Sequence, residues 1–177
     1  MNSLFEIELL NIHWLNNEKE VQLADLCAHG NIYVKINDEI LSDIDTSVWT
    51  VSATGLYLLR TLTQNYTPSM WSNYLLPCCG HFFIKENEEP VIILGCGIGI
   101  DWIIMHEKDN KIKHISKKGS IAIIDENSYE EMVFEFTDKI ESFYKRSIKR
   151  NIFNDKYQKE GYEAFWTEWH KLKNNSS

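Results

Sequence analysis

Three glycines at alternate positions follow an apolar run in the stretch VIILGCGIGIDW, residues 91–102. Glycine lacks a Cβ atom and adopts positive φ angles readily, so this pattern suits two different structures. The run can be a buried parallel strand that enters a glycine-rich loop against a cofactor. It can also be one strand of an antiparallel sheet, followed by a sharp connection to the next strand. The first structure predicts an enzyme, whereas the second predicts a turn that has no chemistry of its own.

The first alternative resembles motif I of the S-adenosylmethionine-dependent methyltransferases, in which a strand ends in a G-x-G-x-G loop. That resemblance implies cofactor contacts from Gly95, Gly97, Gly99 and Asp101. A loop of this kind opens a helix, but residues 102–105 are β-type and a turn signal follows at 108–111. The rest of the chain is also short for further parallel strands, since each crossover takes roughly a dozen residues. We therefore expect a strand-to-strand turn, in which Asp101 is not a ligand.

Alternating apolar residues and turn signals predict a mostly antiparallel sheet in an α+β fold. An opening strand is expected within 4–15, a hairpin over 31–41 with its turn at Asn37-Asp38, and a β-meander over about 81–124. The meander includes two strands joined by Glu86–Glu89 and two more that flank residues 108–111. A length of 177 residues without an internal repeat or a low-complexity linker predicts a single domain.

Amphipathic helices are expected to pack on that sheet. Leucines at helical spacing predict a helix over 50–66, and an apolar stripe predicts another over 128–149. Ser128 and Glu131 fit a capping box at the start of the second helix. An aromatic stripe predicts a helix over 160–172, within a helical tail at 150–172 that docks on the body of the single domain 1–177.

The order strand, glycine turn, meander and helix over 91–143 resembles the C-terminal half of the Smi1/Knr4-like (SUKH) proteins. The matching parts are Leu94-Gly95, Gly99-Ile100-Asp101, the hairpin around Asp109-Asn110 and the helix from Ser128. This resemblance implies a bacterial immunity protein, as in toxin–antitoxin pairs, that binds and neutralises a toxin domain without catalysis.

The charge of the chain limits its partners. The formal net charge is −8, from 26 acidic and 18 basic residues, which argues against a sequence-independent grip on nucleic-acid phosphates. The same charge suits a positively charged protein partner. No apolar run approaches the ~20 residues of a membrane helix, and the first residues lack the basic start of a signal peptide. We expect a cytoplasmic protein that does not bind membranes.

Two short motifs, CAHG at 27–30 and CCGH at 78–81, pair cysteine with histidine. If the motifs meet in space, Cys27, His29, Cys78 and His81 supply ligands for tetrahedral zinc, although their spacing is not that of a zinc knuckle. Alternatively Cys78 or Cys79 is a nucleophile with His81 as one candidate base. The third alternative is that these cysteines are buried without a chemical role.

These observations favour a non-enzymatic binding protein of immunity type, which occludes a basic toxin domain with an acidic and aromatic surface and needs no cofactor. A methyltransferase-like enzyme and a Cys/His site, either thiol enzyme or structural zinc, remain alternatives.

Overall fold

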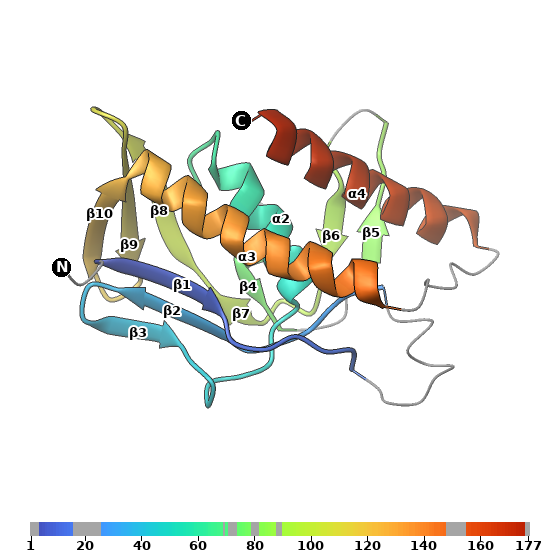
Figure 1. Ribbon diagram of the computed structural model, residues 1–177, viewed down its shortest axis with the longest axis horizontal. Coiled ribbons are helices and arrows are strands. Elements are labelled where there is room, and N and C mark those ends of the chain that lie inside the picture. Colours follow the sequence, from blue (N-terminus) through green and yellow to red (C-terminus); the bar gives the residue numbers. More distant parts are fainter. Residues whose placement is uncertain are drawn as a thin grey trace.

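The computed structural model describes residues 4–15, 26–68, 70, 74–78, 82–87, 90–147 and 155–175. The fold is of the α+β class, as predicted (Figure 1). Its strands are β1 (Phe5–Leu9), β2 (Ile32–Ile36), β3 (Glu39–Ser42), β4 (Leu76–Pro77), β5 (Phe82–Ile84), β6 (Ile92–Leu94), β7 (Gly99–Ile100), β8 (Trp102–Glu107), β9 (Lys111–Ser116) and β10 (Ile121–Asp125). Its helices are α2 (Val51–Thr61), α3 (Glu126–Arg146) and α4 (Lys156–Asn175).

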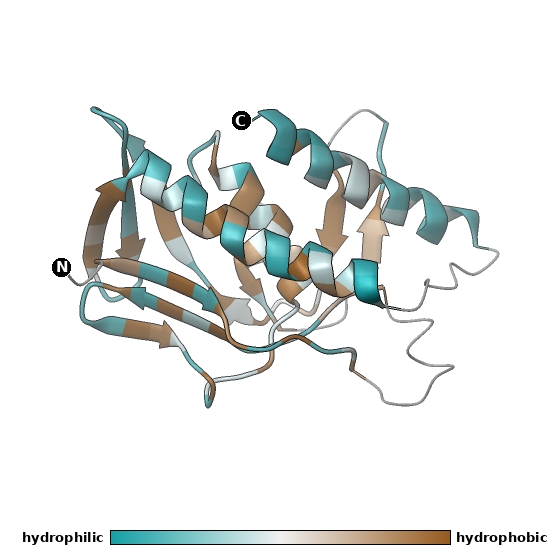
Figure 2. Cartoon of the chain, in the orientation of Figure 1, coloured by the Kyte–Doolittle hydropathy of each residue, from teal (hydrophilic) through white to brown (hydrophobic). Residues whose placement is uncertain are grey.

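Helix α2 is the centre of the molecule, and all of its side chains are buried. Its leucines pack in the core, and Thr54, Arg60 and Thr61 form side-chain hydrogen bonds. Thr61 Oγ1 donates to Leu58 O at 2.6 Å and lies 2.6 Å from the Tyr129 hydroxyl of α3. In Figure 2, α2 is largely hydrophobic, whereas α3 and α4 in front of it turn many hydrophilic residues to the viewer. The burial of α2 explains why it forms a helix although Gly55 lies at its middle.

Every strand pairing among the described residues is antiparallel. Two sheets have three strands, in the orders β1–β2–β3 and β10–β9–β8, and two have only a pair, β4–β7 and β5–β6. The meander predicted for residues 81–124 is thus divided: β8, β9 and β10 form it, and β5–β6 is a separate hairpin. Asn37, Asp109 and Asn110 have positive φ in the predicted turns, a conformation that these residues tolerate.

Helix α3 begins earlier than its sequence signal. The capping box predicted at Ser128 is wrong, because the N-cap is Asp125 and Ser128 lies inside the helix. The Glu126 N–H donates to the Asn110 carbonyl at 2.9 Å. The turn between β8 and β9 therefore satisfies the first amide of α3, and the chain passes from β10 into α3 without a loop.

Helix α4 is an integral part of the core. Gly161, Phe165 and Trp169 are its buried residues, and Phe165 stacks on Phe83 of β5 with ring centroids 4.6 Å apart. This confirms the predicted docking of the aromatic stripe on the body. Among the described helices, none is long and apolar enough to cross a membrane.

Candidate functional site

The glycine segment connects two strands. Residues 95–98 join β6 to β7, and β8 begins at Trp102, so the prediction of a strand after the glycines is confirmed. Gly97 has φ +56 and an open Cβ direction, which identifies it as the left-handed residue of the connection. Gly99 pairs with Pro77, and a Cβ there would lie 2.5 Å from the Leu76 carbonyl oxygen. These two glycines allow a reversal and a close strand approach, while Gly95 is exposed.

Asp101 follows this connection and is held in a fixed position. Its Oδ1 accepts hydrogen bonds from the Tyr66 hydroxyl at 2.8 Å and from the Leu75 N–H at 2.9 Å. Burial raises the pKa of the Asp101 carboxyl, and these two hydrogen bonds oppose the rise. Burial also raises the pKa of Tyr66, so the phenol remains a donor. Among the described residues, no cation forms an ion pair with Asp101.

Asp101 lines a cavity of about 870 Å³ between β3 and the strands β7, β8 and β9. Its walls include the apolar or aromatic residues Ile40, Tyr74, Ile100, Trp102, Ile103 and Ile115. A recess of this size, with apolar walls and a few oriented polar groups, has the general character of a binding site.

Glu39 is the second carboxylate of this cavity, and neighbouring residues of the chain compensate its negative charge. Its Oε2 accepts a hydrogen bond from Ser116 Oγ at 2.5 Å, and its Oε1 lies 3.7 Å from Lys118 Nζ. Hydrogen bonds from Ser116 and Ser120, aided by Lys118, lower the pKa of Glu39. Lys117 at the same cavity is exposed. Asp101 and Glu39 therefore differ: of these two carboxylates, Glu39 alone has a cation nearby among the residues that the structure describes.

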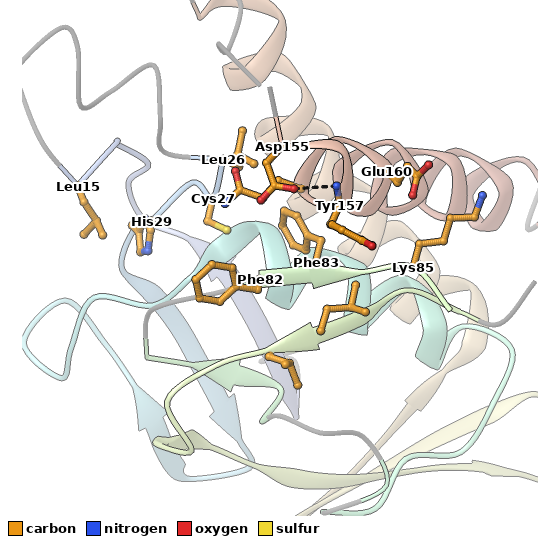
Figure 3. Close-up of a pocket in the computed structure, with 13 residues that line it drawn as sticks. Leu15, Leu26, Cys27, His29, Phe82, Phe83, Lys85, Asp155, Tyr157 and Glu160 are labelled. Atoms are coloured by element: carbon orange, nitrogen blue, oxygen red, sulfur yellow. Dashed lines mark hydrogen bonds between the residues drawn. The ribbon is translucent and has the colours of Figure 1, made fainter. Parts of the chain in front are cut away.

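The cysteine and histidine candidates lie elsewhere. Cys27 and His29 are buried at 5% and 2% exposure and line a cavity of about 460 Å³ together with Phe82, Phe83 and Tyr157 (Figure 3). Cys78 is half-buried, and its N–H donates to the Ile98 carbonyl at 2.9 Å, extending the β4–β7 ladder.

Cys79 and His81 lie outside the described residues, so the zinc set and the proposed nucleophile–base pair stay predictions. Within the described part of the chain, no three His, Cys, Asp or Glu side chains are grouped so that they can hold a metal ion.

An acidic face covers the outside of the β1–β2–β3 sheet. Alternation turns Phe5, Ile7 and Leu9 of β1 into the core, so Glu6 and Glu8 point outward opposite Lys35 and Tyr33 of β2. Lys35 Nζ pairs with Glu6 Oε1 at 3.0 Å.

The connections after β2 and β3 carry further acids, Asp38, Asp43 and Asp45. Lys35 is the lone basic residue that residues 4–10 and 32–48 contain. This acidic sheet face, formed by Glu6, Glu8, Asp38, Asp43 and Asp45, is one-sided in charge.

The acidic sheet face continues into the Asp101 cavity through β3. A register shift opposite Val34 and Lys35 leaves Leu41 as the extra residue of a bulge, so Ile40 lies opposite Lys35. Ile40 is 53% exposed and also lines the cavity. On the far side of the cavity, Ile103 and Ile115 form a cross-strand pair on the outer face of β8–β9. Charged, apolar and recessed surfaces are therefore contiguous around β3.

No family model, curated protein or solved structure matches this chain. The resemblance to the SUKH proteins accordingly remains a prediction.

Sequence reasoning considered Asp101 only as a cofactor contact of the methyltransferase alternative, and it missed the residues that hold this carboxylate. Tyr66 and Leu75 precede Asp101 by 35 and 26 residues, and no local pattern connects them to it. The acidic sheet face could have been predicted from the sequence, because Glu6 and Glu8 alternate with apolar residues that are buried in β1.

Proposed function

We propose that this protein is a non-enzymatic binding protein of immunity type, which neutralises a basic toxin domain by occluding it. The acidic sheet face is the observation that carries the proposal. Five acids lie on one sheet and its connections, opposed by one lysine that already pairs with Glu6. A surface of one sign attracts a partner of the opposite sign and accelerates encounter. Tyr33 and Ile40 add aromatic and apolar contact area to the same face.

The alternatives receive less support from the geometry. In a methyltransferase the glycine loop is followed by a helix, but here β8 follows it and the neighbouring pairings are antiparallel. A thiol enzyme needs an activated and accessible cysteine. Of the two candidate nucleophiles, Cys78 is half-buried in a segment that extends the β4–β7 ladder, and Cys79 lies outside the described residues.

The experiment is co-expression with the product of the gene immediately upstream. If that product is the toxin, it arrests growth alone, and this protein restores growth and co-purifies with it. The complex should weaken as salt rises, because its attraction is electrostatic. Absence of both rescue and co-purification would remove the immunity proposal.

Two charge-reversal variants locate the interface. Glu8→Lys/Asp45→Lys changes the acidic sheet face but leaves the Glu6–Lys35 pair intact. Glu131→Lys/Glu163→Lys makes the same change of charge at exposed positions of α3 and α4. We expect the first variant to bind about tenfold more weakly or worse, mainly through slower association, and the second to differ little. Equal losses in both variants would show that only net charge matters and would exclude this face as the interface.

A further inference from the structure

We propose that the cavity beside β3 is a receptor for one cationic side chain of the partner, an arginine or lysine that pairs with Asp101. This inference rests on the proposed function, since it assumes that the partner is a basic protein that covers β3. It assigns a class of ligand, a cationic side chain, to Asp101, the acidic residue that follows the glycine segment.

The first argument is the arrangement of hydrogen bonds at Asp101. Both donors, the Tyr66 hydroxyl and the Leu75 N–H, bind Oδ1. Oδ2 therefore keeps its lone pairs for a further donor. Because two bonds fix the carboxylate, its orientation is set before any ligand arrives, and preorganisation of this kind favours binding.

The second argument is charge. Partial withdrawal of the Asp101 carboxylate from water costs free energy, which its two hydrogen bonds offset in part and a paired cation would offset further. Glu39 has Lys118 at 3.7 Å, but in the part of the chain that the structure describes Asp101 has no cation in an ion pair. Lys117, also at the cavity, is exposed and forms no ion pair with Asp101. Since no described residue supplies this cation, we assign it to the basic partner.

The third argument is the apolar wall. Tyr74, Ile100 and Ile103 line the cavity around Asp101. Arginine and lysine carry a charged end on a stem of methylene groups, and such stems pack well against apolar surface. A divalent metal ion is a poor fit, because calcium takes six to eight oxygen ligands and Glu39 is already engaged by Ser116 and Lys118.

The variant Asp101→Asn separates a ligand role from a structural one. Asparagine keeps an oxygen that accepts both hydrogen bonds, but it removes the charge. If Asp101 serves folding through its charge, the variant will be less stable than the wild type. If Asp101 serves a ligand, the variant will be equally or more stable and will bind cations less well.

The direct test uses a small probe. N-acetyl-L-arginine methylamide is titrated into ¹⁵N-labelled protein, with the neutral citrulline analogue as the matched control. We expect saturable shifts of the Leu75 and Asp101 amides with the arginine probe in the millimolar range, and no saturable shift with citrulline. Asp101→Asn should abolish the shifts, while Glu8→Gln outside the cavity should preserve them. Equal responses to both probes, or shifts that survive in Asp101→Asn, would overturn the proposal.

A second variant and a second readout keep the outcomes distinct. Should Asp101→Asn fail to fold, Ile103→Ala removes part of the apolar wall and should weaken binding of the arginine probe without a change of charge. Arginine binding without rescue from the upstream product contradicts the immunity function but leaves the cavity assignment in place. If Asp101→Asn instead rescues growth and binds the toxin with wild-type affinity, the immunity function stands but the cavity assignment is overturned. The toxin is then bound without any of its cations entering this cavity.

Discussion

Arg60 of α2 and Glu168 of α4 form a buried ion pair in which Nε lies 2.7 Å from Oε1. The same two side chains also bind the backbone of Val91, since Arg60 Nη2 donates to its carbonyl and Glu168 Oε2 accepts from its N–H, each at 2.7 Å. One pair of charges thus joins the central helix, the C-terminal helix and the segment that enters β6. It orients the chain just ahead of the glycine connection.

Replacement of Arg60 by methionine should destabilise the fold by about 3–5 kcal/mol, because it leaves the Glu168 carboxylate buried without its cation. Denaturant unfolding monitored by tryptophan fluorescence measures the change. Lys159→Met is the matched control, since Lys159 pairs with Glu163 on the exposed side of α4 and such pairs contribute less than about 1 kcal/mol. Similar small losses in both variants would contradict the structural role of the Arg60 pair.

Gly55 marks the close approach of α2 to α4. A Cβ at this position would lie 2.5 Å from Cη2 of Trp169 and 3.0 Å from Cδ1 of Ile140. We expect Gly55→Ala to cost about 1–3 kcal/mol through overpacking, although alanine favours a helix. Trp169→Phe should relieve that clash, so the double variant should be more stable than the sum of the two single changes predicts. A double-mutant cycle measures this coupling, and additive losses would exclude the contact.

His114 should make stability depend on pH. Its side chain is fully buried, Nδ1 accepts from Trp102 Nε1 at 3.2 Å, and the ring stacks on Phe5. Burial lowers the pKa of His114 to about 3 from its ordinary value of 6.5. Between these two pH values the unfolded chain binds a proton that the folded protein does not, so acidification below pH 6.5 favours unfolding.

One such histidine lowers the free energy of unfolding by about 1.4 kcal/mol for each pH unit of acidification in this range. Unfolding free energies between pH 6.5 and 5 measure it, since most carboxylates stay ionised in that window. Burial works to raise the pKa of Glu141, but hydrogen bonds from Trp169, Lys173 and Lys145 lower it to about 2, so that residue contributes only at lower pH. In His114→Gln the slope between pH 6.5 and 5 should be smaller by this amount. An NMR titration in which the His114 ring protonates near pH 6 would refute the prediction.

Gly97 distinguishes a turn from a cofactor loop. Its φ is +56 and the Cβ direction is open, so only backbone conformation restricts substitution. Gly97→Asn should be tolerated, while Gly97→Val should cost about 1–2 kcal/mol or more, because a β-branched residue disfavours the left-handed region. We expect the melting temperatures of both variants and of the wild type to be independent of added S-adenosylmethionine. A ligand-dependent rise in the wild type that Gly97→Val abolishes would support the methyltransferase alternative.

Much of the fold could be predicted from local patterns. The hairpin turns at Asn37, Asp109 and Asn110 rest on residues that tolerate positive φ, and the strands beside them alternate as expected. The start of α3 could not be predicted in the same way. Its first amide binds the carbonyl of Asn110, which lies in a turn between two earlier strands, so a contact that is distant in the sequence stabilises the start of this helix.

The sequence by itself determined the α+β class, the mostly antiparallel pairing and the role of the glycines after β6 as a connection, because alternation, turn chemistry and positive φ are local properties. Only the tertiary structure decided the environment of Asp101. Its hydrogen bonds to Tyr66 and Leu75, the cavity around it and the compensation of Glu39 by Lys118 all join residues that are distant in the chain. A carboxylate acquires its charge balance from whatever packing brings beside it, and no spacing along the sequence encodes that.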